Sequence, residues 1–296
     1  MDLHLFSQFL IAGIIMGTLY CMLSLGLNFI YGIMKVMNWS MGEFFMIGAY
    51  VQYLLITHVI GVQYWYIGVI ISAFCGFFLG VLVQRILIKP MFVGIIEQKL
   101  EYGTIITISL AIFLRNLAFT VGGPYIYTPP DYAGPTYIGT LPVSGNRFVA
   151  LIGALILLAL FYYFIKRTWM GKAFQAVAQN RSGVQTAGIN VLRFDAIAFG
   201  IGTTLAAYGG ALLAPIFLAH PMCGLIPTTR GFEIIVIAGL GSIPGVLIAS
   251  LSLGIAESLG SAFINPSFLD IYGFVLLVLV LLIKPFGLFG KEERMA

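Results

Sequence analysis

Charged residues are scarce in this chain of 296 residues. Asp, Glu, Lys and Arg make up 9% of it, whereas a soluble domain carries roughly a quarter. So few charges cannot cover a water-facing surface, which excludes an ordinary soluble globular protein. Because 60% of the residues are hydrophobic, we expect an integral membrane protein.

Long stretches without charge run along the whole chain. A helix needs about 20 apolar residues to cross the hydrocarbon core of a bilayer. Five charge-free stretches qualify, at 5–34, 44–84, 148–165, 196–229 and 234–256, and two more (102–122 and 258–283) hold one charge each. They continue far beyond a signal peptide and lack the alternation of a barrel strand. We predict one all-α polytopic membrane domain over 1–296, with about eight membrane helices or half-helices.

The residues that intramembrane enzymes use are missing. No His-Glu-x-x-His zinc pair occurs, and Leu240 stands where a nucleophile elbow around Ser242 needs glycine. No ATP-binding phosphate loop occurs either, since Ala173 follows Gly171-Lys172. Three cysteines in apolar stretches, without metal-ligand spacing, are assigned to packing. We therefore expect no enzyme, no metal and no cofactor bound by this chain; it also lacks the signature of a channel selectivity filter.

Basic residues predict the orientation of the chain. Lys and Arg collect in short cytoplasmic loops, and three segments hold 11 of the 15. They are Arg85, Lys89 and Lys99; Lys166, Arg167, Lys172, Arg181 and Arg193; and Lys284, Lys291 and Arg294. We place these segments and the C-terminus in the cytoplasm. The segment 122–146 has no basic residue and is placed outside, and the side of the N-terminus stays open.

A break in the helix is predicted within 231–258. Three apolar stretches, near 196–218, 231–258 and 267–283, lie between the second basic segment and the tail, an odd number where an even number of crossings is needed. Gly239-Leu-Gly-Ser-Ile-Pro-Gly245 resolves the conflict if it interrupts a re-entrant segment, because glycine and proline disfavour a continuous helix. Transporters place substrate sites beside such breaks. The alternative is one helix kinked at Pro244 in a glycine-rich interface.

A second interruption is the polar insert that contains Asn38, Ser40 and Glu43. Ionisable groups at membrane depth mark pathways or partners, and here only Glu43 lies in a compact polar context. Arg115 and Glu233 are expected to reach the interface from helix ends, and Glu257 is left between pore and interface. A weak similarity between 38–48 and 240–250 hints at a duplicated transporter half.

The basic segment 171–188 is short, alanine-rich and amphipathic. Ala173, Val177, Val184 and Ala187 recur near helical spacing, which predicts a short helix under the membrane, broken near 180–183. Its apolar face and small residues favour a docking surface for another protein. The alternative is a solvated loop that only sets topology.

With these residues in view, the chain resembles the shorter permease subunit of the branched-chain amino acid ABC importers. The resemblance covers nearly the whole chain and is carried by motifs at 17–26, 30–38, 42–43, 48–50, 170–178, 187–190, 239–245, 253–257 and 284–290. The family's insert usually reads Asn-Phe-Ala-His-Gly-Glu, whereas Trp39, Ser40 and Met41 replace Phe-Ala-His here. That departure keeps urea or a short amide open as the cargo, and an ion-coupled secondary transporter is a further alternative.

The resemblance implies the partners and the site. Expected partners are a second related permease, two cytoplasmic ATPase subunits that use the ATP, an extracytoplasmic solute-binding protein and the lipid of the cell inner membrane, but no nucleic acid. The segment 166–195 would be the ATPase coupling loop, with Gly171, Lys172, Ala173, Ala176, Ala187 and Gly188 at the contact. The translocation path is expected along Asn38, Ser40, Glu43, Gly239, Gly241, Ser242 and Gly245.

Overall fold

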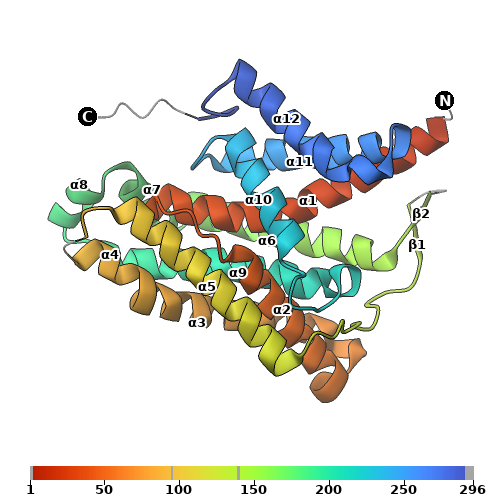
Figure 1. Cartoon of the computed structure of the whole chain (residues 1–296), viewed down its shortest axis with the longest axis horizontal. Helices are drawn as coiled ribbons and strands as arrows, with labels where there is room; N and C mark the ends of the chain where they lie inside the picture. Colours follow the sequence, from red (N-terminus) through yellow and green to blue (C-terminus); the bar gives the residue numbers. More distant parts are fainter. Residues whose placement is uncertain (1–2, 95, 139–140, 291–296) are drawn as a thin grey trace.

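A computed structural model describes residues 3–94, 96–138 and 141–290 of the chain (Figure 1). Within them the structure is almost wholly helical, as predicted. Eight helical stretches are long and apolar enough to cross a membrane. They are Leu5–Met34, Met41–Ile60, Val62–Val93, Lys99–Gly122, Gly145–Arg167, Val191–Phe217, Ile243–Phe263 and Pro266–Ile283. The chain is a multi-pass membrane protein.

The helices follow one another with short connections. The α-helices are α1 (Leu3–Met34), α2 (Met41–Leu55), α3 (Trp65–Val83), α4 (Lys89–Val93), α5 (Lys99–Gly122), α6 (Gly145–Arg167), α7 (Trp169–Gln179), α8 (Arg181–Thr186), α9 (Val191–Phe217), α10 (Leu225–Ala238), α11 (Ile243–Phe263) and α12 (Leu269–Ile283). Short π- or 3-10 segments extend four of them: η1 (Ile56–Ile60), η2 (Val62–Tyr64), η3 (Gln84–Ile88) and η4 (Pro266–Phe268). Strands β1 (Thr136–Ile138) and β2 (Leu141–Val143) pair antiparallel in the segment before α6.

Two long helices, α1 and α9, form the centre of the bundle. Most of their residues are buried, and α1 packs along α11 while α9 packs along α2 and α3. By contrast few residues of α5, α6 and α12 are buried, and many of their large apolar side chains are exposed at the periphery. The start of α1 and the β-hairpin lie at one end of the bundle, and α7, α8 and the end of α12 lie at the other (Figure 1).

Glycines let the central helices approach one another closely. A Cβ on Gly48 of α2 would lie 2.0 Å from the carbonyl oxygen of Ala207 on α9. A Cβ on Gly210 of α9 would lie 1.9 Å from the carbonyl oxygen of Phe45 on α2. In a membrane the hydrophobic effect does not drive helices together, because lipid is as apolar as their side chains. Helices associate instead through close packing, which small residues at the contact allow.

The predicted break within 231–258 is confirmed. Helix α10 ends at Ala238, and the turn contains Gly239 and Gly241 with φ of 89° and 85°, a backbone region that favours glycine. Helix α11 then begins at Ile243, with Ser242 as its N-cap and Pro244 in its first turn, where proline is tolerated. The alternative of one helix kinked at Pro244 is therefore wrong.

Helix α10, which follows the end of α9, is a half-helix. With 14 residues α10 is about 21 Å long, too short to cross the hydrocarbon core alone. The links 35–40 and 218–224, which lead into α2 and α10, each start with a non-glycine residue in the left-handed region, Lys35 (φ 56°) and Leu218 (φ 59°). Both α2 and α10 thus begin after a sharp reversal of the chain.

Candidate functional site

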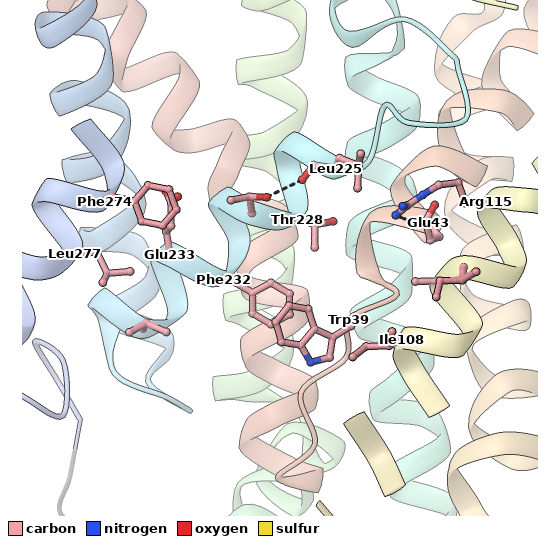
Figure 2. Close-up of a pocket in the computed structure, with 14 residues that line it drawn as sticks. Trp39, Glu43, Ile108, Arg115, Leu225, Thr228, Phe232, Glu233, Phe274 and Leu277 are labelled. Carbon is pink, nitrogen blue, oxygen red and sulfur yellow. Dashed lines mark hydrogen bonds and ion pairs between the residues drawn. The ribbon is translucent and has the colours of Figure 1, made fainter. Parts of the chain in front are cut away.

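A groove of about 430 Å³ opens between the start of α2, one face of α5, α10 and α12 (Figure 2). Its walls are mainly apolar side chains. Figure 2 shows Glu43 and Arg115 pointing toward each other on one side and Glu233, Phe274 and Leu277 on the other. Apolar cavities of this size with a few placed polar groups are typical of small-molecule sites.

An ion pair stands at one side of the groove. Arg115 Nη2 of α5 donates to Glu43 Oε1 in the first turn of α2, at 2.5 Å. The Glu43 side chain is 5% exposed and that of Arg115 is 26% exposed. Glu43, which was predicted to be a functional group at membrane depth, has Arg115 as its ion-pair partner. The prediction that Arg115 reaches the membrane interface is wrong, because its guanidinium turns inward to a buried carboxylate instead.

The rest of the polar insert shapes the start of α2. Asn38 Oδ1 accepts from Ser40 Oγ at 2.6 Å and from Ser40 N at 3.0 Å, which makes a tight local turn. Both side chains are fully buried. Trp39 between them is exposed to the groove and packs on Phe232 of α10, with ring centroids 4.3 Å apart. Asn38 and Ser40 therefore position the groove residues Trp39 and Glu43, and their place on the route stays a prediction.

The starts of α2 and α10 meet beside this pair. A Cβ on Gly42 would lie 2.3 Å from the carbonyl oxygen of Gly224, and a Cβ on Gly224 would lie 1.9 Å from that of Gly42. Only glycine permits this approach on both sides. Helix N-termini carry partial positive charge. Because two of them meet here, this region of the bundle has a positive potential. The weak similarity between 38–48 and 240–250 does not indicate this contact. The segment 240–250 contains the start of α11, whereas the start of α2 contacts the start of α10.

The glycine-rich turn after α10 lies apart from the groove. Gly241 N donates to Asn28 Oδ1 of α1 at 2.8 Å, and Leu288 N donates to Ile237 O at 2.8 Å. A Cβ on Gly239 would lie 2.3 Å from the backbone of Gly290. None of the residues Gly239, Gly241, Ser242 and Gly245 lines the groove beside Glu43. Their role in the translocation path stays a prediction.

A second buried ion cluster ties α10, α11 and α12 together. Arg230 is 1% exposed and contacts Glu233 at 3.1 Å, Glu257 at 2.6 Å and Asp270 at 2.7 Å. The contact with Glu257 is an ion contact that is not aligned as a hydrogen bond. The prediction that Glu233 reaches the interface is wrong, and Glu257 belongs to this cluster. In the sequence analysis an apolar stretch ends just before Arg230, and no partner was assigned to this residue. The i,i+3 spacing of Arg230 and Glu233 places both on one helix face and could have indicated the pair.

The predicted short helix at 171–188 is present as α7 and α8, with the break at Asn180. Asn180 Oδ1 caps α8 by accepting from Gly183 N at 2.8 Å. Gly188 (φ 83°) ends it: Gly188 N donates to Gln185 O and Ile189 N donates to Val184 O, the bonds of a Schellman cap. The expected left-handed stop at Gly188 is confirmed.

The apolar face of this segment is not free. Ala173, Val177 and Val184 are buried, and Phe174 packs on rings of α1, α6 and α9. The interpretation of these residues as an open apolar docking face is wrong, because the bundle itself covers them. Gly171 faces the backbone of α6 and Ala176 is half-buried. Of the six coupling residues, the exposed ones are Lys172, Ala187 and Gly188.

Arg181, at the start of α8, joins three other elements. It donates to Ile33 O of α1 at 2.8 Å and to the buried Asp195 of α9 at 2.6 and 3.1 Å, and its guanidinium lies over the Phe92 ring of α4 at 4.7 Å. Lys291 and Arg294, which were used for the orientation, lie outside the described residues.

Known proteins are similar over nearly the whole chain. Residues 9–283 match the model of the family described as branched-chain amino acid transport system / permease component. The high-affinity branched-chain amino acid transport system permease protein LivH of Salmonella typhimurium is 32% identical, with 97% of this chain and 96% of the relative covered. BraD of Pseudomonas aeruginosa, of the same description, is 26% identical over 99% of this chain and 98% of its own.

Two more distant similarities extend this result. The permease protein LivM of Salmonella typhimurium is 27% identical, with 92% of this chain and 68% of the relative covered. Among solved structures, PsaBC from Streptococcus pneumoniae in complex with Fab matches with a TM-score of 0.52 and 15% identity, covering 96% of this chain and 93% of that chain. That match supports the helical fold alone.

Proposed function

Because this chain belongs to the family of branched-chain amino acid transport system permease components, we propose that it is the shorter permease subunit of an ATP-driven importer of branched-chain or other small aliphatic amino acids. The observation that carries this function is the Glu43–Arg115 pair in a groove at the side of the bundle. Ionisable groups within membrane helices by default mark pathways. The subunit itself catalyses nothing; separate ATPase subunits hydrolyse the ATP.

The groove is half of a pathway in this proposal. Its walls include residues of α5, α10 and α12, and many large apolar side chains of α5 and α12 are exposed. A second permease of the same family covers this side, and the similarity to LivM fits such a pairing. The substrate then passes between the two subunits rather than through one of them.

The two ends of the bundle meet different partners. The basic residues Lys166, Arg167 and Lys172 lie at the end of the bundle that holds α7 and α8. In a protein of the inner membrane, the positive-inside rule therefore favours a cytoplasmic location for this end and for the C-terminus. The start of α1 and the segment 122–146 are then outside. That segment is the proposed contact for a solute-binding protein.

The outer segment is held to the bundle by specific contacts. Tyr132 stacks on Trp65, with ring centroids 4.9 Å apart, and its hydroxyl donates to Ala211 O at 2.6 Å. Burial raises the pKa of Tyr132, so this hydroxyl stays a donor at neutral pH. Asn146 Nδ2 donates to Asp131 Oδ1 at 2.6 Å. A segment fixed in this way can present a defined surface to a docking protein.

Reconstitution tests the proposed function directly. In vesicles that contain this chain, the second permease, the ATPases and the binding protein, we expect labelled leucine to accumulate only when ATP is supplied on the ATPase side. Urea should not accumulate, because the pathway carries amino acids. Leucine uptake by this chain alone without ATP would instead identify a secondary transporter, and urea uptake would identify the amide alternative.

A charge on the exposed part of the coupling segment should uncouple the motor. Ala187→Glu adds a carboxylate at an exposed position beside the Gly188 cap, so the permease should fold normally but lose the ATPase or hydrolyse ATP without transport. The measurement is co-purification of the ATPase together with leucine uptake. Gly134→Glu, an exposed position at the opposite end, should retain the ATPase. Normal attachment and uptake in Ala187→Glu would reduce the segment to a topology-setting loop.

A further inference from the structure

The Glu43–Arg115 pair indicates which chemistry the groove recognises, an inference that rests on the proposed function. We propose that the pair is a subsite for the zwitterionic end of a free amino acid. Glu43 receives the ammonium group and Arg115 receives the carboxylate. Trp39 and Phe232 contact the aliphatic side chain.

Arg115 has hydrogen-bonding capacity left over. A guanidinium carries five N–H donors, and only Nη2 is used, on Glu43 Oε1. In the described part of the chain Arg115 Nε has no hydrogen-bond partner, although it is buried. The side chain as a whole remains 26% exposed beside the groove. A planar donor fork of this kind is suited to a carboxylate, which it can hold through two parallel bonds.

The two charges also favour a zwitterion over an ion or a neutral solute. Glu43 and Arg115 form a dipole, and an amino acid zwitterion is a second dipole that lies antiparallel to it with every charge beside an opposite one. A single cation or anion would gain one attraction and one repulsion. Urea carries no formal charge, so it can hydrogen-bond to both side chains but gains no attraction between opposite formal charges.

The other ion cluster at the groove does not fit this role. Glu233 also lines the groove, but its partner Arg230 is 1% exposed and is surrounded by three carboxylates. A substrate carboxylate would meet an excess of negative charge there. The Glu43–Arg115 pair is balanced, and it is the one whose guanidinium reaches the groove.

The rest of the groove suits an apolar side chain. Trp39 packs on Phe232 with Ile108 close by, and Leu225 lines the same groove (Figure 2). The threonine hydroxyls in the wall bond to the helix itself, Thr228 to Gly224 O and the neighbouring threonine to Leu225 O. Their O–H donors are therefore already used and do not call for a hydrogen-bond acceptor on the substrate side chain. The groove thus selects an amino acid with an aliphatic side chain.

Charge variants in the reconstituted complex test the subsite. Glu43→Gln and Arg115→Gln should each lower leucine uptake roughly ten- to hundredfold at normal abundance, as expected for a lost hydrogen bond to a charged group. The swap Glu43→Arg with Arg115→Glu should also keep normal abundance but lose uptake, because it reverses the dipole that the substrate has to match. Asn116→Leu, an exposed position next to Arg115, is the matched control and should transport normally. Full uptake in the swap would make the pair merely structural.

A protection assay measures recognition without the binding protein. Thr228→Cys, in a chain whose native cysteines are replaced, places a thiol in the groove wall for a maleimide probe. Leucine should slow labelling, whereas isopentylamine, which lacks the carboxylate, and 4-methylpentanoate, which lacks the ammonium, should not. Equal protection by either compound, or none by leucine, would overturn the subsite. Absence of ATP-driven leucine uptake in the wild type would instead refute the proposed function.

Discussion

Replacing Arg230 by methionine should remove most of the folded protein from the membrane. Arg230 is the only cation in contact with Glu233, Glu257 and Asp270 among the described residues, and the first two carboxylates are buried with it. Methionine keeps the apolar stem but leaves those carboxylates without a partner. Breaking a buried ion pair from one side costs about 3–5 kcal/mol, which is a large part of the stability of a typical domain. The amount of membrane-inserted, monodisperse protein measures the effect.

Two further variants separate the missing charge from the changed shape. Combining Arg230→Met with Glu233→Gln and Glu257→Gln removes the unpaired charges, and we expect a substantial part of the protein to return. Arg230→Lys keeps the charge but not the planar fork, so its loss should be smaller. If Arg230→Met accumulates like the wild type, the cluster does not hold α10, α11 and α12 together.

The second large effect is expected at Gly210 of α9. In Gly210→Ala the new methyl group would lie 1.9 Å from Phe45 O and 2.7 Å from Phe45 C, which are backbone atoms of α2. No side-chain rotation relieves that overlap, so α2 must move away from α9. Overpacking of this kind costs about 1–3 kcal/mol or more. We expect a lower melting temperature and a lower yield, and lost transport because α2 carries Glu43.

The neighbouring residue provides the control. A Cβ on Gly209 would lie 3.7 Å from the end of Met22, an ordinary contact, and alanine favours a helix over glycine by about 1 kcal/mol. Gly209→Ala should therefore be neutral or slightly stabilising. A similar loss in both variants would mean that flexibility of this helix, rather than its closeness to α2, is what matters.

Much of the architecture could be predicted because a bilayer imposes simple requirements. Charge-free length located the spans, and glycine with Pro244 located the break before α11. The apolar stretch that ends near 218 agrees with the end of α9, but the next stretch was placed from 231 rather than from Leu225, because 218–229 contains no charge that marks where a helix starts. The reversal of the chain before α10 depends on the contact between Gly224 and Gly42, which are far apart in the sequence.

The site was only partly predictable for a related reason. The polar surroundings of Glu43 marked it as a group at depth, but hydropathy gives the position of a charge along its helix and not its partner. Arg115 and Glu233 were therefore assigned to the interface, and Arg230 was overlooked. The opposite error occurred at Ala173, where the amphipathic pattern revealed an apolar face but not that the chain's own helices cover it.

Arg181 connects the short helix α8 to the end of α1 and to α9. Its bonds reach Ile33 in the last turn of α1, two residues before Lys35, where the backbone reverses toward Trp39 and Glu43. Its other bonds, to Asp195, hold the same guanidinium to α9. In the proposed function, an ATPase subunit that moved α8 would pull, through the Arg181 side chain, on the end of α1 from which the chain leads to Trp39 and Glu43 in the groove wall.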